Sequence, residues 1–152
     1  MKTLAILADR EGIARRLELV RVDSPRRWGK MSAHQMVCHL ADSFRGVMGE
    51  KALAMKPGTF GRGLMKWVAL YSGIPWPHGV KTMPEMDQLV GGTRPLEFAV
   101  DHQRLRVLFG RFVREPRDFV WRKHPMFLVM SDTDWMRWGY LHMDHHFRQF
   151  GV

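Results

Sequence analysis

Cysteine is nearly absent from this chain, because Cys38 is the single example in 152 residues. That scarcity excludes an intramolecular disulfide framework and favours a reducing compartment. Long apolar runs are also missing, and none approaches the roughly 18 residues that a membrane-spanning helix needs. The first apolar run stops at Asp9 and Arg10, so it is too short for a secretory signal. We therefore expect a cytoplasmic protein with no membrane association.

Acidic residues are scarce relative to basic ones, with 15 Asp and Glu against 24 Lys and Arg and a formal net charge of +9. Such an excess is compatible with nucleic-acid binding. The basic residues are spread over the whole chain in runs no longer than two, such as Arg15-Arg16, and no recognition motif accompanies them. The sequence therefore disfavours nucleic acid as a partner. Its length and its 45% apolar content predict one globular domain over 1–152.

Sustained alternation of polar and apolar residues, which is typical of strands, does not occur. Apolar residues instead recur at helical spacing in four segments, at about 3–20, 32–48, 95–115 and 131–150. Ser32 and Ser131 suit the N-caps of the second and fourth segments, and Pro95 suits the first turn of the third. Four amphipathic helices predict an all-α protein, specifically a four-helix bundle with one long crossover.

The crossover, 57–93, is rich in glycine and proline, and 64–71 within it could form a short helix. Long loops in compact domains are more often functional or interface-forming than idle. The segment also carries more large apolar residues than a small core can bury, so we expect a homodimer. The spacing Gly58-x-x-Gly61-x-Gly63 resembles a phosphate-binding loop only in its glycines, because no Lys-Ser/Thr follows.

Histidines carry most of the functional information, and three of the eight fall at 142–146. On a helical wheel the solvated face of the last segment carries the charged residues Arg137, Asp144 and Arg148. His142 and His146 point the opposite way, so two inward imidazoles four residues apart could bind one metal ion. The alternative is that each packs in the core against a polar partner. His145 lies about 100° round from His146, on the shoulder.

A third ligand would have to come from another helix, and two candidates compete. His39 lies on the flank of the second segment, where a bundle helix meets its neighbour, and His102 lies on the apolar stripe of the third. The wheel ranks these two together. His34 falls on the polar side of the second segment and is expected to be exposed, whereas His78 and His124 fall in loops without helical constraint.

The segment 28–40, WGKMSAHQMVCHL, followed much later by the His142-x-x-x-His146 pair, resembles the DinB/YfiT-like superfamily of metal-dependent bacterial proteins. The closing HMDHHFRQF, preceded by HPMF at 124–127, resembles one uncharacterised branch of it, a domain of unknown function. This resemblance covers essentially the whole chain apart from 57–93. It implies a four-helix bundle in which zinc or nickel is held by His39, His142 and His146. It therefore favours His39 as the third ligand and leaves His102 in the core or beside the site.

Three neutral imidazoles leave a zinc-like ion its +2 charge and an open position, as in catalytic sites. That position could hold water or a thiol, and the superfamily includes thiol S-transferases and isomerases as well as presumed hydrolases. The segment 142–146, HMDHH, lacks the Glu of H-E-x-x-H, which disfavours a zinc peptidase. His145 is then the nearest candidate for a proton acceptor, although a surface position is its commoner role. Cys38 falls on the polar side beside His34 and is expected to be neither ligand nor nucleophile.

The sequence thus predicts a divalent-metal-dependent enzyme that acts on a small molecule as a thiol S-transferase or hydrolase, with a low-molecular-weight thiol as a candidate cofactor. A metal-binding or interaction module without catalysis is the alternative, and a nucleic-acid-binding protein comes third. Metal analysis of the purified protein would separate the first two hypotheses from the third, because both require a bound metal ion and nucleic-acid binding does not.

Overall fold

The computed structural model describes residues 1–55 and 61–152, and in that part of the chain all regular structure is helical. Its elements are the α-helices α1 (Leu7–Leu19), α2 (Ala33–Val47), α3 (Arg62–Tyr71), α4 (Phe98–Val113) and α5 (Asp132–Gln149), and a short 3₁₀ helix, η1 (Pro84–Met86). The prediction of an all-α protein is confirmed, and the predicted short helix at 64–71 exists as α3.

Capping determines how well the helix boundaries follow from the sequence. Ser32 and Ser131 each form the expected capping box, with Gln35 and Asp134 as the reciprocal partners. The first helix begins at Leu7 rather than near residue 3. The residues before it form a turn, in which the Ile6 amide donates to the Thr3 carbonyl, and the Leu4 amide donates to the Met136 carbonyl of the last helix at 3.1 Å.

The third predicted segment also begins later than expected, at Phe98. The residues just before it, 93–97, have no regular structure, and the Leu96 amide donates to the Asp101 carboxylate at 3.2 Å. Pro95 therefore precedes the helix and does not occupy its first turn.

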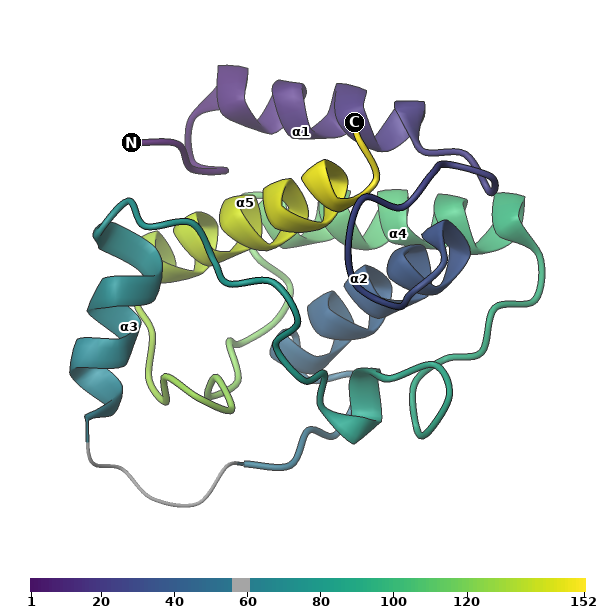
Figure 1. The fold of residues 1–152 in the computed structure, drawn as a ribbon. Coiled ribbons are helices and arrows are strands. Elements are labelled where there is room, and N and C mark those ends of the chain that lie inside the picture. The colour runs from purple at the N-terminus through teal and green to yellow at the C-terminus, as the bar shows by residue number, and fades with distance from the viewer. Residues whose placement is uncertain (56–60) are drawn as a thin grey trace.

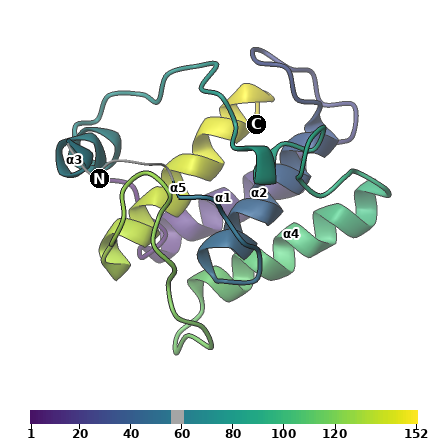
Figure 2. The ribbon, with the colours of Figure 1, turned by 90° about the horizontal axis from the view of Figure 1, so that it is seen from below.

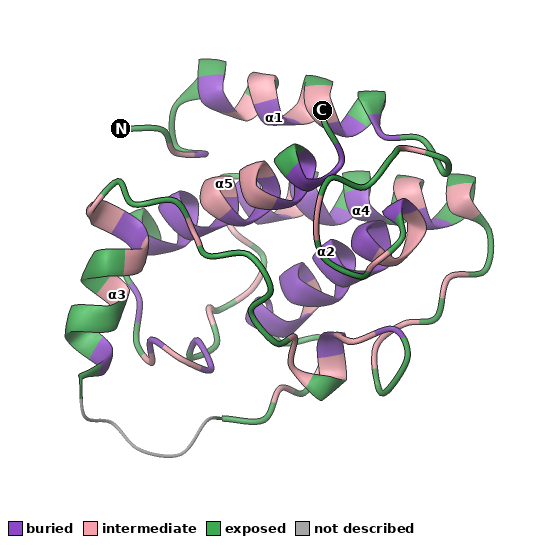
Figure 3. Cartoon of the chain, in the orientation of Figure 1, coloured by how far each residue is buried: buried purple, intermediate pink, exposed green. Residues whose placement is uncertain are grey.

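The helices pack in two pairs, α2 along α4 and α1 along α5, as Figures 1 and 2 show. The interior between the pairs is aromatic. The Phe44 ring of α2 lies 4.7 Å from Phe112 of α4 and 6.3 Å from Trp138 of α5, measured between ring centroids. Figure 3 shows that α2 is buried over almost all of its length, whereas α1 and α3 are exposed along one side.

Gly139 brings α5 close to its neighbours. A Cβ atom at this position would lie 2.8 Å from Leu4 Cδ1 and 2.8 Å from Phe112 Cε1. Because both neighbours are fully buried, neither can move away cheaply. Glycine therefore allows α5 to contact the N-terminal segment and α4 at the level where the histidines of α5 begin.

The crossover wraps outside these helices, and α3 lies against the beginning of α5 (Figure 1). Asp134 holds α3 there, since its carboxylate accepts from Lys66 Nζ at 3.0 Å and from the Tyr71 hydroxyl. Of the glycine pattern in this segment, Gly58 lies outside the described residues. None of the helices in the described residues is both long and apolar enough to traverse a bilayer.

This covering by α3 explains a wrong prediction about α5. Arg137 was expected on a solvated face, but only 8% of it is exposed and its Nε donates to the Leu70 carbonyl of α3 at 2.8 Å. Asp144, on the same predicted face, is partly covered by α1, where Arg16 Nη1 donates to it at 2.6 Å. Arg148 alone of the three is exposed. A wheel gives the direction of a side chain but does not show which segments cover it.

Candidate metal centre

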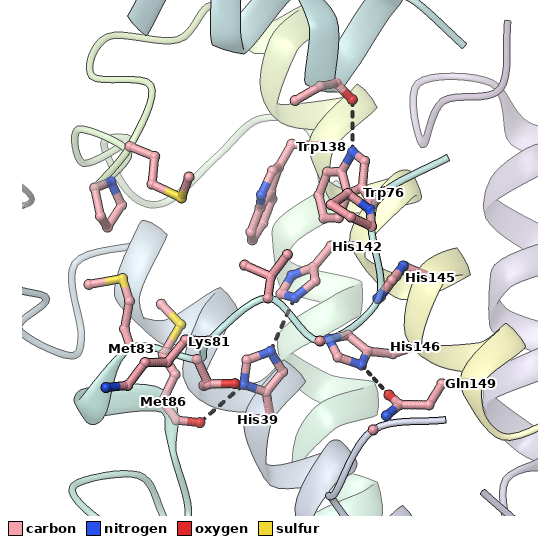
Figure 4. Close-up of a pocket in the computed structure, with 18 of the residues that line it drawn as sticks. His39, Trp76, Lys81, Met83, Met86, Trp138, His142, His145, His146 and Gln149 are labelled. Carbon is pink, nitrogen blue, oxygen red and sulfur yellow. Dashed lines mark hydrogen bonds between the residues drawn. The ribbon is translucent and has the colours of Figure 1, made fainter. Parts of the chain in front are cut away.

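Three histidines from two helices converge at one point in the interior, as Figure 4 shows. His39 comes from the middle of α2, and His142 and His146 come from successive turns of α5. One ring nitrogen of each lies within 4.8 Å of the others, and all three residues are buried. His39 Nε2 and His142 Nε2 are 3.2 Å apart. The structure therefore brings together the three residues that the sequence predicted as ligands, and the group could hold a metal ion.

Hydrogen bonds fix the orientation of two of the three rings. His39 Nδ1 lies 3.1 Å from the Met86 carbonyl oxygen, which can only accept, so Nδ1 carries the proton and the Nε2 lone pair faces the centre. His146 Nδ1 lies 2.9 Å from Gln149 Oε1. The Gln149 Nε2 amide donates to the Trp28 carbonyl, which fixes the amide so that its oxygen faces the imidazole. Outer partners of this kind are typical of metal-binding histidines.

The nitrogen positions fit a bound cation. Without one, two imidazole nitrogens at 3.2 Å must share a proton, and His142 Nδ1 is buried without a hydrogen-bond partner among the described residues. With one, zinc–nitrogen distances of about 2.0–2.1 Å at a tetrahedral angle place two ligand nitrogens about 3.3 Å apart. Neutral imidazole donors suit zinc and nickel. The donor set and the distance between these two nitrogens are thus compatible with a metal site.

Burial keeps these histidines in the form that binds metals. Removal from water lowers the pKa of His39 below its ordinary value and lowers the pKa of His142 and His146 well below it. For His142 and His146 the neighbouring imidazoles lower the pKa further, because two protonated rings would repel each other. The three rings are therefore neutral near pH 7, which is the protonation state in which imidazole binds metal ions.

His145 lies beside this trio and does not belong to it. Its ring centroid is 5.3 Å from that of His146 and 5.9 Å from that of Trp28, and the residue is half-buried. It is thus on the shoulder of the helix, as the wheel predicts, although it contacts aromatic rings as well as solvent.

We expect the His145→Ala protein to retain its metal. Because no donor atom of His145 belongs to the convergent group, metal content per chain should equal that of the wild type when measured by inductively coupled plasma mass spectrometry. His146→Ala, one residue further along α5, is the matched control and should lose the metal. Equal losses in the two variants would show that α5 is rotated and that His145 is a ligand.

The remaining histidines have local structural roles. His102, the rival third ligand, lies at the interface of α4 with α1, where its Nε2 is 2.9 Å from the Leu17 carbonyl oxygen. The His78 ring stacks on Trp28 with centroids 4.0 Å apart. The Nδ1 atom of His124 accepts the amides of the turn that follows it, and burial lowers the pKa of His124 to about 3.

A second group of donors, at the N-terminal end of α4, corrects two predictions. Cys38 and His34 were expected on a polar face, but Cys38 is 1% exposed and the His34 side chain 14% exposed. The start of α4 covers them, and His34 Nε2 lies 2.8 Å from Asp101 Oδ2. With Asp101 they could also hold a metal ion. However, the Asp101 carboxylate already accepts from Arg104 at 2.6 Å.

The Cys38 thiol also argues for the histidine trio as the better candidate. Burial, with Asp101 nearby, raises the pKa of Cys38 to about 12. Metals bind the thiolate, so a thiol this weakly acidic is a poor ligand. The prediction that Cys38 is neither ligand nor nucleophile stays a prediction, although its expected exposure was wrong.

A large cavity opens beside the trio, with a volume of about 1250 Å³. His39, His142 and His146 form part of its wall, together with the indoles of Trp28, Trp76 and Trp138. Much of the remaining wall comes from α3 and from the crossover after it, in the segment 61–89. Besides its histidines, the unusual length of that loop and its large apolar residues were the sequence signals of this cavity.

Comparison of the chain with protein-family models, with curated proteins and with solved structures found no match in any of the three.

Proposed function

We propose that the protein is a DinB-like four-helix bundle, built from α1, α2, α4 and α5, and a metal-dependent enzyme that acts on a small molecule. His39, His142 and His146 would hold zinc or nickel, and the reaction would be thiol transfer or hydrolysis. One observation carries this proposal: three neutral imidazole nitrogens converge at the wall of a cavity of about 1250 Å³. A structural metal site needs no such cavity, because all its ligands come from the protein.

The ion would supply a +2 charge that activates a water molecule or thiol at its remaining position. The chain's own groups hold the ligands and exclude bulk water. The Met86 carbonyl and Gln149 orient two of the three imidazoles. Trp76 and Trp138 lie with their rings 6.0 and 4.9 Å from that of His142, on the cavity side. Their bulk lowers the local dielectric and strengthens any charge interaction at the site.

Proton transfer would fall to His145 rather than to a carboxylate. Among the described residues, Asp87 is the sole acidic side chain in the cavity wall. His145 is in that wall as well, next to His146, and its buried Nδ1 has no hydrogen-bond partner among the described groups. A general base of this kind is compatible with water or thiol activation and differs from the glutamate of zinc peptidases.

The rival functions have less support. Carboxylates of the same chain pair with many of the basic residues, among them Arg16, Arg104, Arg106, Arg114 and Arg117. Such pairs reduce the charge available to a phosphate backbone, which disfavours nucleic-acid binding. A metal-binding module without catalysis would share the histidine trio, but it would leave the adjoining cavity without a role.

Cobalt substitution tests this proposal directly. Co²⁺ bound by three imidazoles should absorb visible light, and acetohydroxamic acid or 2-mercaptoethanol should shift the spectrum by occupying the remaining position. Double-stranded DNA at the same concentration should leave it unchanged. The proposed function would be refuted if the protein binds no cobalt, or if neither small ligand changes the absorption spectrum of the cobalt protein.

A further inference from the structure

The cavity wall beside the histidine trio is mostly apolar. Besides three tryptophans it contains five of the chain's twelve methionines, Met31, Met65, Met83, Met86 and Met126. Methionine side chains are flexible and polarizable, so walls made of them adapt to apolar ligands of varying shape. Binding sites for drug-sized molecules measure about 300–1,000 Å³. A cavity of about 1250 Å³ therefore has room for a ligand with a long or bulky apolar part.

The mouth of the cavity is apolar as well. Six large apolar residues in its wall are also exposed to solvent, on α3 and the crossover: Leu64, Met65, Val68, Ile74, Val80 and Leu89. We call these residues the apolar rim. A patch of this kind normally marks a binding site. An apolar path thus runs from the surface to the metal ligands.

The inner end of the cavity, at the histidine trio, would carry positive charge, whereas the rim is apolar. Imidazole ligands carry no charge when they bind a metal ion, so a divalent ion held by these three histidines would keep its full +2 charge. Two lysines, Lys30 and Lys81, lie in the wall against one acid, Asp87. Both lysines are exposed, and in Figure 4 the Lys81 ammonium lies on the side of its chain away from the histidine trio, so their charge lies toward the solvent side of the cavity. This balance favours an anionic or metal-binding head group over a cationic one.

Combining these observations, we propose that the substrate is an amphiphile: a molecule with an anionic or thiol head that reaches the histidine trio and an alkyl or aryl-alkyl tail that lies along the apolar rim. This inference rests on the proposed function for its head group and on the cavity wall alone for its tail. Small polar thiols would fill only the inner end of the cavity and leave the rim exposed to water.

Two hydroxamic acids with the same head and different tails test the inference. Acetohydroxamic acid and octanohydroxamic acid differ by six methylenes, and each methylene that becomes buried should tighten binding about fourfold. If half of them are buried, octanohydroxamic acid should bind the cobalt protein about 60-fold more tightly in a titration of its visible spectrum. Quenching of tryptophan fluorescence in the metal-free protein gives a second measurement that needs no metal.

A matched pair of valine substitutions locates the tail. Val68→Asn changes the rim, and Val107→Asn changes an exposed valine of α4 outside the cavity wall. Both positions are in helices and partly or largely exposed, so both variants should fold. Val68→Asn should lower the affinity for octanohydroxamic acid about tenfold, the equivalent of about 1.4 kcal/mol, and leave the affinity for acetohydroxamic acid unchanged. Val107→Asn should change neither affinity.

The outcomes separate this inference from the proposed function. Equal affinities for the two hydroxamic acids would overturn the amphiphile and leave the metal enzyme intact. The two measurements can also disagree with each other. Stronger tryptophan quenching by octanohydroxamic acid, with no change in the cobalt spectrum from either compound, would overturn the proposed metal enzyme and still support the apolar binding site for the tail. Light scattering tests whether the apolar rim is instead a dimer interface. If the protein is a homodimer, and Val68→Asn dissociates it without changing the affinity for either hydroxamic acid, the rim contacts a second copy and the inference is overturned.

Discussion

Alanine in place of His39, His142 or His146 is expected to abolish stoichiometric metal binding in each of the three proteins. Each of these residues would supply one of the three proposed protein ligands, and the substitution also leaves a void in a buried site. The loss of affinity should exceed the roughly 10–100-fold that loss of an outer partner costs. Competition with a chromophoric chelator measures the affinities, and mass spectrometry of metals gives the content per chain.

Gln149→Ala is the graded control for these three variants. Gln149 accepts from His146 and binds no metal itself, so its loss should weaken the affinity by about 10–100-fold and leave the stoichiometry at one ion per chain. Metal binding should also raise the unfolding free energy of the wild type, by about 2.7 kcal/mol when free metal is 100 times the dissociation constant. Full metal content in His142→Ala would refute the assignment.

Phe44→Ala is expected to remove a large part of the stability of the fold. Phe44 is 1% exposed, and its ring contacts Phe109 and Phe112 of α4 and Trp138 of α5. Truncation of a buried phenylalanine costs about 3–5 kcal/mol, against a total of about 5–15 kcal/mol for a typical domain. Urea unfolding of the metal-free protein, followed by circular dichroism, measures the loss without the contribution of the metal.

Leu96→Ala is the control for Phe44→Ala. Because Leu96 is 89% exposed, its truncation should change the unfolding free energy by no more than about 0.5 kcal/mol. Similar losses in the two proteins would mean that Phe44 does not lie at the junction of α2, α4 and α5. An unchanged slope of free energy against urea would show that the unfolded states are comparable.

The sequence predicts the helices better than their surroundings. Ser32 and Ser131 mark the starts of α2 and α5 because capping is local and needs no tertiary contact. The buried positions of His34, Cys38 and Arg137 could not be predicted, because they depend on the start of α4 and on α3, which are far away in the chain. Periodicity gives an angle around one helix, whereas burial depends on what packs against it.

The candidate site, too, could be predicted only where the signal is local to one helix. Helical spacing alone pairs His142 with His146, since residues four apart share a face. Spacing could not choose between His39 and His102, and the family resemblance made that choice. The Met86 carbonyl that orients His39 comes from η1, inside a crossover whose path has no periodic signal. The cavity is formed largely by the same crossover, so it could not be predicted either.

Met86 connects the two halves of the site, because its carbonyl orients His39 while the residue itself forms part of the cavity wall. A molecule that contacts η1 from within the cavity would therefore change how firmly the Met86 carbonyl orients His39, one of the three candidate ligands. Thermodynamic linkage makes the effect mutual: if an occupied cavity retains the ion more tightly, a bound ion retains the occupant more tightly by the same factor. Affinity for the metal would then vary with the supply of the organic ligand, and a chelator would strip the protein most easily when that ligand is scarce.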